Sequence, residues 1–356
     1  MLYICREFMR LEAKHILSVT LLLVFIFGTK AQDSYYSQYY NNMIYYNPAY
    51  TGLDEGLKVR FDYRDQWPKY NDDLKSYNFN MDFAEWTVPG LGGFGLIFNT
   101  NKEGKGLIKT NFVGIAGSSR IRIQRHWITQ VGATVAFVQK QIDVGDFIWS
   151  DQLDDRHGLL YPESSFAGSP SQSISYADVN LGGLIKYDKR LITATLGVGI
   201  SHLLKPNESF YNLDVRVPRK YNVNIDVVFL QRNNPRKGFK FNPGLMYEYQ
   251  NTFHNITLGM NVMKSVVYAG AWYRNRNSAI YNVQSVMFVV GVQIPMVNEH
   301  SRIKLMYSYD VGISNMNGTG GAHEITLRFQ FDEIHLIKSN SYFSRDYPVI
   351  VEPLRF

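Results

Sequence analysis

The side chains that could carry chemistry are scattered in this chain. Eight histidines are present, and no two of them stand at a metal-binding spacing such as HxxxH. His323 precedes Glu324, but no second histidine follows nearby to complete a zinc site. The sequence has neither a GxSxG nucleophile elbow nor a GxxxxGKS/T phosphate loop. These patterns predict a protein that is not an enzyme and that uses no cofactor or metal.

One acidic run, Gly145–Arg156, raises the question of calcium. Its carboxylates are Asp146, Asp151, Asp154 and Asp155, and spaced carboxylates are ligands that calcium prefers. Their order does not match the EF-hand loop, and an acidic loop is more often simply hydrated. We therefore expect a solvated loop, with calcium binding as the minor alternative.

Charged side chains alternate with apolar ones between Lys58 and Arg64. Alternate residues of a strand point to the same face, so this segment would have one charged and one apolar face. Residues 302–310 show the same alternation. Facing charges of both signs could line a selective channel or close a lumen with salt bridges, and we favour the closed lumen. The candidate lumen-lining residues are Lys58, Arg60, Asp62, Arg64, Arg302, Lys304, Asp310 and Arg328.

Long strands must position these side chains. Residues 324–331 (EITLRFQF) alternate polar and apolar residues, and similar segments recur between residues 56 and 332. Their length of about 9–12 residues matches a tilted membrane crossing and exceeds the roughly 5–6 residues usual in soluble strands. About 14 such segments can be placed, and an even number suits an outer-membrane barrel. The predicted fold class is all-β, a transmembrane antiparallel β-barrel of about 14 strands.

Composition and connection lengths favour this barrel over a soluble β-sandwich. Charged residues make up 19% of the chain, below the roughly 25% of an average soluble domain, and aromatic residues reach 15%. The longest connections, 141–174, 203–219 and 311–320, alternate with tight turns, which predicts long outer loops and short periplasmic turns. Aromatic residues that we expect near strand ends, as interfacial girdles, are Trp67, Tyr70, Trp86, Trp127, Trp149, Trp272 and Tyr273.

Glycines stand inside several predicted strands, at residues 92–95, 182–183 and 197–199. In a soluble sheet they would mark ordinary bulges. In a strongly coiled barrel they permit bends and close packing inside the lumen, and this is the interpretation that we favour.

The first 31 residues have the features of a signal peptide. The apolar run Ile16–Gly28 follows a basic region, and small residues precede a cleavage site between Ala31 and Gln32. The alternative, a membrane anchor, is disfavoured because the run is too short to span a bilayer. Met9 is an alternative initiator to Met1.

The cysteine count and the charge exclude further classes. The only cysteine, Cys5, lies in the predicted leader, so internal disulfides and cysteine-based zinc sites are excluded. The net charge of +6 is spread along the chain, which predicts no nucleic-acid partner. The predicted organisation is a signal peptide (1–31), an N-terminal periplasmic segment (32–55), an outer-membrane barrel (56–332) and a C-terminal periplasmic extension (333–356).

Several short motifs resemble the PorP/SprF family of the type IX secretion system, found in Bacteroidota. The first three are SQYY at 37–40, YYNPAYTG at 45–52 and YRDQW at 63–67. Later matches are SHL at 201–203, GAWYR at 270–274, YSYD at 307–310 and AHEI at 322–325. The resemblance covers about residues 32–331, and its specificity lies in the order and spacing of the motifs. The chain departs from the family pattern at Tyr176–Asp178 and in its tail after Phe331.

The resemblance implies a non-catalytic barrel in the cell outer membrane that supports secretion, surface anchoring or display of a partner substrate. Such substrates are often large adhesins, and some family members are tied to gliding motility. The implied partners are outer-membrane lipid, the secreted surface protein, a periplasmic peptidoglycan-binding lipoprotein and other type IX components. The polar stripes leave one alternative open, an outer-membrane porin or small-solute transporter.

Residue types alone add one expectation about the YNPA box. Pro48 fixes its own φ and restricts Asn47, so the box should form a fixed turn that brings the N-terminal segment to the barrel wall. This turn could serve folding or partner docking. The candidate structural or docking residues are Gln38, Tyr39, Tyr46, Asn47, Pro48, Ala49 and Gly52.

Overall fold

The computed structural model divides the chain into two compact units, Met1–Ser34 and Tyr35–Phe356, and every described residue belongs to the second. The described residues are 35–54, 56–70, 74–84, 90–104, 107–143, 148–154, 156, 158–159, 161, 171–210, 213–231, 238–277, 282–296, 301–314 and 318–331. The predicted signal peptide, its cleavage site at Ala31 and Gln32, and the predicted extension 333–356 lie outside them. So do Asp146 and Asp155 of the acidic run.

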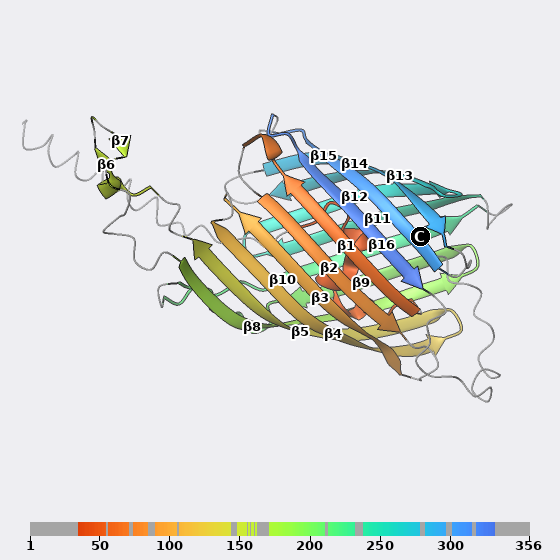
Figure 1. Cartoon of the computed structure of the whole chain (residues 1–356). Helices are drawn as coiled ribbons and strands as arrows, with labels where there is room; N and C mark the ends of the chain where they lie inside the picture. Colours follow the sequence, from red (N-terminus) through yellow and green to blue (C-terminus); the bar gives the residue numbers. More distant parts are fainter. Residues whose placement is uncertain are drawn as a thin grey trace, which may run out of the picture. The chain divides into compact units, whose positions relative to one another are not determined.

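The second unit is built from long antiparallel strands that close into a barrel (Figure 1). The strands of the barrel are β1 (Gly56–Gln66), β2 (Leu74–Ala84), β3 (Leu91–Glu103), β4 (Ile108–Gln124), β5 (Trp127–Asp143), β8 (Ser171–Lys189), β9 (Ile192–Ser201), β10 (Lys220–Leu230), β11 (Phe239–Gln250), β12 (Phe253–Lys264), β13 (Val267–Asn277), β14 (Asn282–Pro295), β15 (Ser301–Gly312) and β16 (Ala322–Phe331). A separate two-stranded sheet holds β6 (Leu153–Asp154) and β7 (Gly158–Leu159). The short helices are η1 (Tyr39–Asn41), α2 (Met43–Tyr46), η2 (Pro48–Tyr50), η3 (Pro68–Tyr70) and η4 (Ser150–Gln152).

The first and last strands close the wall. Within β1, Tyr63 is paired with Tyr77 of β2 on one side and with Ile325 of β16 on the other. Each strand of the barrel therefore has two hydrogen-bonded neighbours, so the wall has no open edge. The predicted 14-strand antiparallel barrel is confirmed.

No helix among the described residues is both long and apolar enough to cross a membrane.

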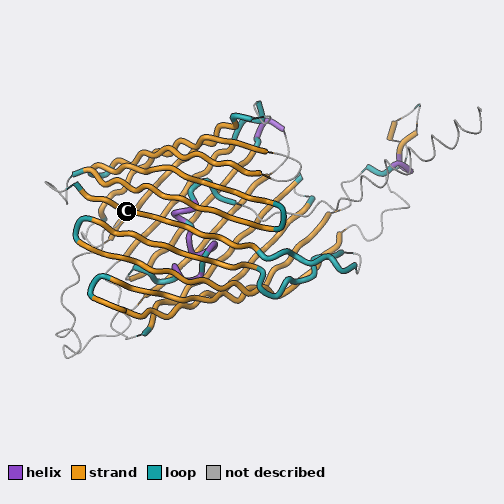
Figure 2. Tube along the Cα trace, turned by 180° about the vertical axis from the view of Figure 1, so that it is seen from behind, coloured by secondary structure: helices purple, strands orange, loops and turns teal. Residues whose placement is uncertain are grey.

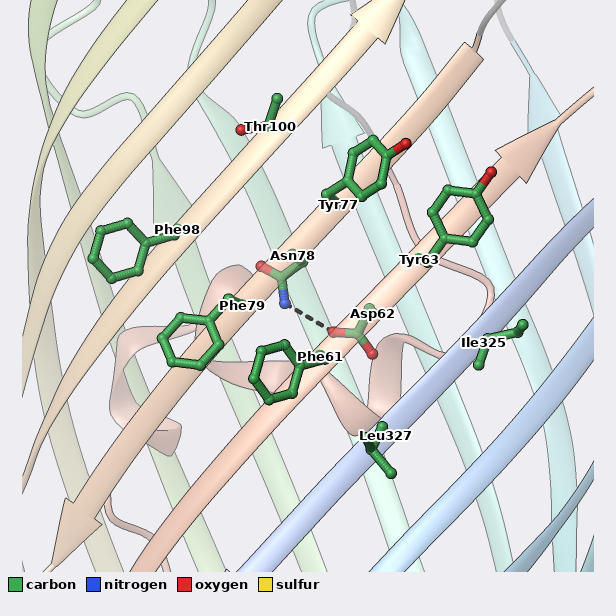
Figure 3. Close-up of a pocket in the computed structure, with 10 residues that line it drawn as sticks. All are labelled: Phe61, Asp62, Tyr63, Tyr77, Asn78, Phe79, Phe98, Thr100, Ile325 and Leu327. Atoms are coloured by element: carbon green, nitrogen blue, oxygen red, sulfur yellow. Dashed lines mark hydrogen bonds between the residues drawn. The ribbon is translucent and has the colours of Figure 1, made fainter.

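The two faces of the wall have opposite character. Outward-facing Phe61 and Phe79 are on the apolar side, with ring centroids 4.9 Å apart, whereas inward-facing Asn224 is fully buried. Figure 3 shows both sides where β16, β1 and β2 meet: the two phenyl rings border a pocket of about 400 Å³, while Asn78 donates a hydrogen bond to Asp62 (2.8 Å). Apolar residues outward and polar residues inward are the arrangement of a barrel in lipid.

Trp272 departs from the predicted aromatic girdle. It lies in the middle of β13, is only 2% exposed and points into the barrel, where its Nε1 donates to Asn261 (2.9 Å). Trp127 begins β5 and is exposed on the outer wall, as a girdle residue would be. The difference follows from strand parity, because Tyr268 and Arg274 place the even-numbered positions of β13 on the inner face. Trp86 lies outside the described residues.

The two ends of the barrel carry connections of different length. At one end, here the short-turn mouth, residues 125–126, 190–191 and 265–266 join consecutive strands. The other end, here the long-loop mouth, carries residues 144–170, 202–219 and 313–321, together with the tight turn 251–252. At the short-turn mouth, β1 begins and β16 ends.

Candidate functional site

Residues 35–54, here the plug, lie inside the barrel and carry the short helices η1, α2 and η2 (Figure 2). The prediction placed this segment in the periplasm, in contact with the barrel wall. The structure shows instead that it runs through the lumen, from the long-loop mouth at Tyr35 to the start of β1 at the short-turn mouth. The physical reason is the polar interior, which supplies hydrogen-bond partners to a segment with little regular secondary structure.

A carboxylate of the wall holds the plug near the long-loop mouth. The backbone N–H groups of Ser37 and Gln38 both donate to Glu324, at 2.6 and 2.9 Å. The Ser37 hydroxyl donates to Asp310 (2.6 Å). All four residues are buried, so these hydrogen bonds to charged acceptors belong to the strong class.

Two arginines complete this buried cluster. Arg64 Nη2 is 3.1 Å from Asp310, and its Nη1 is 3.3 Å from Glu324. Arg274 Nη1 is 3.4 Å from Asp310, and its Nη2 donates to the Tyr36 carbonyl (2.9 Å). The cluster joins four strands to the plug, and its two positive and two negative groups balance one another.

Aromatic rings pack the middle of the plug against the wall. Tyr39 meets Trp272 edge-on with centroids 5.4 Å apart, and Tyr40 stacks on the same indole at 5.0 Å. The Tyr46 hydroxyl accepts a hydrogen bond from the Tyr36 backbone N–H (2.9 Å). Tyr36, Tyr39 and Tyr46 are all buried, so part of the aromatic content forms an interior core rather than a lipid-facing surface.

The YNPA box forms the expected tight turn, and it does so inside the lumen. Asn47 Oδ1 accepts a hydrogen bond from Ala49 N (2.9 Å), which caps η2, and Pro48 occupies the first turn of that helix. Asn47 Nδ2 donates to the carbonyls of Gly183 and Val198, at 3.2 Å each. One asparagine therefore shapes the turn and binds it to two strands of the wall.

Wall glycines make room for this turn. A Cβ on Gly132 would lie 2.4 Å from the Pro48 carbonyl oxygen, and one on Gly182 would lie 1.9 Å from Asn47 Oδ1. Neither distance is compatible with a side chain, so glycine is required by close approach of the backbone. The interpretation that strand glycines permit close packing inside the lumen is confirmed at Gly182, and Gly132, which was not among the predicted glycines, behaves in the same way.

The plug is also held near the short-turn mouth. Gly52 N donates to Asp82 (2.9 Å), and the Thr51 carbonyl accepts from Gln130 Nε2 (2.6 Å) and Ser118 Oγ (2.7 Å). Gly52 has a φ of +62°, a conformation that glycine adopts without strain. All seven residues of the candidate docking motif are buried in the lumen, and of these Gly52 lies near the short-turn mouth.

The structure places all eight candidate lumen-lining residues at inward-facing strand positions. Two of them, Arg302 and Arg328, are half-buried, and the other six are buried. Several contact groups of opposite charge: Arg60 with Asp82 (2.5 Å) and Lys58 with Asp54 (2.6 Å). Such contacts are those of a packed, charge-paired interior.

Sequence reasoning missed Glu324, Arg274 and Asp82 as interior residues. Each falls on the inward side of an alternating strand, so the period of two could have identified all three. No local pattern indicates that Glu324 accepts hydrogen bonds from the backbone N–H groups of residues 37 and 38. In the described part of the chain, no three His, Cys, Asp or Glu residues are grouped as metal ligands would be.

The sequence matches the model of one protein family over residues 28–329, described as the type IX secretion system membrane protein PorP/SprF. The chain belongs to the PorP/SprF family. It is accordingly an outer-membrane β-barrel of type IX secretion. No curated protein matches it in sequence.

Solved structures resemble this PorP/SprF barrel only distantly. A Pseudomonas aeruginosa FadL homologue is 11% identical with a TM-score of 0.43, covering 80% of this chain and 92% of its own. The CymD monoaromatic hydrocarbon channel is 9% identical with a TM-score of 0.43, covering 86% and 96%. The Pseudomonas putida toluene transporter TodX is 8% identical with a TM-score of 0.43, covering 85% and 94%.

The motifs that carry the PorP/SprF resemblance meet in space. Ser37 and Gln38 of SQYY contact Asp310 of YSYD and Glu324 of AHEI, and Arg64 of YRDQW binds both carboxylates. These motifs are far apart in the chain and become neighbours only when the barrel closes around the plug. Their shared role in the structure is to hold the plug.

We predict that Gly132→Val unseats the YNPA turn. The added side chain collides with the Pro48 backbone, so the free energy of unfolding should fall by about 1–3 kcal/mol, as is typical of overpacking. Gly117→Val is the matched control, because a Cβ there has no neighbour within 4 Å. Denaturant unfolding in detergent micelles measures both, and equal stability of the two variants would contradict the proposed close approach.

We predict that Glu324→Ala destabilises the protein by about 3–5 kcal/mol, because it breaks a buried ion pair and leaves two backbone N–H groups unpaired. Asp214→Ala removes a pair with Arg216 that is exposed, and should cost less than about 1 kcal/mol. Thermal unfolding followed by circular dichroism compares the two. Similar losses in both variants would show that Glu324 does not anchor the plug.

We predict that the intact barrel gives no steady pores in planar bilayers and that deleting residues 35–50 does. Retained barrel structure is checked by the heat-dependent shift in gel mobility. The pair of substitutions Gln38→Ala and Asn47→Ala keeps the chain length and removes two plug contacts with the wall, so it should give brief openings. Steady conductance from the intact protein would contradict the prediction that the plug closes the lumen.

Proposed function

We propose that this PorP/SprF barrel is a non-enzymatic accessory of type IX secretion that supports secretion, surface anchoring or display of a partner substrate. The observation that carries the proposal is the plug, which buries polar contacts along the lumen and leaves the barrel suited to binding rather than to solute flow. Because the family belongs to the type IX secretion system, we place this binding in that system. The family is described as a secretion-system membrane protein, and this description is consistent with the proposed non-enzymatic role.

The partner in this proposal is a secreted surface protein, adhesin-like and in some settings related to gliding. It would reach the barrel from the long-loop mouth, which we assign to the cell surface because outer loops of such barrels are longer than periplasmic turns. Outer-membrane lipid covers the apolar wall. A periplasmic peptidoglycan-binding lipoprotein and other type IX components are proposed partners at the short-turn mouth.

The second candidate is a porin or small-solute transporter. It is favoured by one observation, the continuous polar lining of the lumen with residues such as Asn80, Asn222 and Asn261. It requires the plug to leave, whereas both ends of the plug are bonded to the wall. Bilayer conductance of the intact protein separates the two candidates.

We predict that deleting the gene in the native host abolishes surface display of its secreted partner, for which a large adhesin encoded nearby is the first choice. Antibody labelling of intact cells measures display, and an unrelated type IX cargo serves as the control for general secretion. Complementation with the wild-type gene should restore labelling, and complementation with Gly132→Val should restore it less well. Unchanged display after deletion would count against an accessory role.

A further inference from the structure

A cavity of about 250 Å³ lies at the long-loop mouth, where the plug begins. It is lined by the outer ends of β1, β13, β14, β15 and β16 together with Tyr35 of the plug. Tyr35, Trp67 and Arg276 are half-buried, whereas Arg64 and Asp310 are buried. The cavity therefore combines a buried polar interior with a partly accessible rim.

Three guanidinium groups surround the ring of Tyr35, which lines this cavity. The guanidinium carbons of Arg64, Arg274 and Arg276 lie 4.8, 4.7 and 4.0 Å from the centre of the Tyr35 ring. Two carboxylates, Asp310 and Glu324, face the same group and bind Arg64 and Arg274. Among the described residues around the Tyr35 ring, three are positively and two are negatively charged, and Arg276 is the arginine nearest to the rim.

Two buried polar atoms of the lining lack a hydrogen-bond partner among the described residues. They are Nε of Arg64, a donor, and Oδ1 of Asp310, an acceptor. Buried groups of this kind are costly unless a ligand or water satisfies them. A ligand that presents an anionic acceptor beside a neutral donor would satisfy both, and a carboxylate carried next to a peptide N–H has this combination.

The rim holds a strained residue. Trp67 has a φ of +58°, which is uncommon for a large side chain, and its backbone N–H donates to the Gly321 carbonyl (2.8 Å). Such strain persists only where surrounding contacts enforce it, and it clusters at binding sites. Its indole lines the cavity, so its fluorescence should change when a ligand binds there.

We propose that this cavity is a binding site for an acidic peptide segment presented at the cell surface. Arg276 and Nε of Arg64 bind the carboxylate, and Oδ1 of Asp310 accepts a neighbouring peptide N–H. The site goes beyond the accessory role proposed above, because it is defined on the purified barrel and does not depend on which cargo is displayed. Loss of surface display after gene deletion and loss of peptide binding in vitro can therefore be told apart.

The direct test uses the purified full-length protein in detergent micelles and two tripeptides, N-acetyl-Asp-Asp-Asp-amide and N-acetyl-Asn-Asn-Asn-amide. The acidic peptide should give a saturable change in tryptophan fluorescence that is absent from Trp67→Phe, and calorimetry on the same samples measures binding independently of the fluorophore. Arg276→Gln should weaken binding about tenfold or more, because a hydrogen bond to a charged group is lost. Arg122→Gln, which removes a cation at the exposed short-turn end of β4, should leave it unchanged.

Three outcomes overturn the proposal: no saturable binding of the acidic peptide by either method, equal binding of the asparagine peptide, or unchanged affinity in Arg276→Gln. The heat-dependent gel shift of each variant confirms that the barrel is folded.

Access from the surface is tested in cells with single cysteines in a Cys5→Ser background, which otherwise has no cysteine. Tyr35→Cys at the outer end of the plug should react on intact cells with a membrane-impermeant thiol reagent, and the acidic peptide should slow the reaction. Leu53→Cys, at the other end of the plug, should react only after the outer membrane is permeabilised. The reverse pattern would place the cavity on the periplasmic side and refute binding at the cell surface.

Discussion

Everything in this structure depends on the rule that backbone polar groups inside a membrane must find partners within the protein. The strands satisfy it by closing β1 against β16, which removes every free edge. Closure encloses a lumen that the alternation of side chains makes polar. The backbone polar groups of the plug also need hydrogen-bond partners, and they find them inside the lumen. Much of its backbone lies outside regular structure, so N–H groups of Ser37, Gln38 and Gly52 bind carboxylates of the wall.

Charge pairing decides how firmly the plug is seated. Arg64 connects Asp310 of β15 with Glu324 of β16 and lies on β1, so one side chain joins the closing seam to the plug anchor. Buried charges of this kind are stable only when each has its partner. The wall glycines add a steric condition, since the turn at Asn47 fits where side chains are missing. Barrel closure and plug seating are therefore coupled, because both use the same residues.

A plugged barrel has two faces that partners can reach, one at each mouth. The long-loop mouth combines the start of the plug with a donor-rich cavity, and the short-turn mouth carries the connections to the rest of the chain. Buried hydrogen bonds join the plug to the wall along the lumen. The motifs that mark the family hold the plug in place.

The sequence by itself determined the strands, their number, and which side chains face inward, because a period of two is a local property that each strand carries on its own. Parity also explains why Trp272, which was predicted in a girdle, falls on an inward position. The position of the plug was decided only by the tertiary structure. Several of its contacts join residues separated by more than a hundred positions, as between Ser37 and Glu324 or Asn47 and Gly183. Such pairs exist only after the barrel has closed, so no local pattern could place the segment inside the lumen.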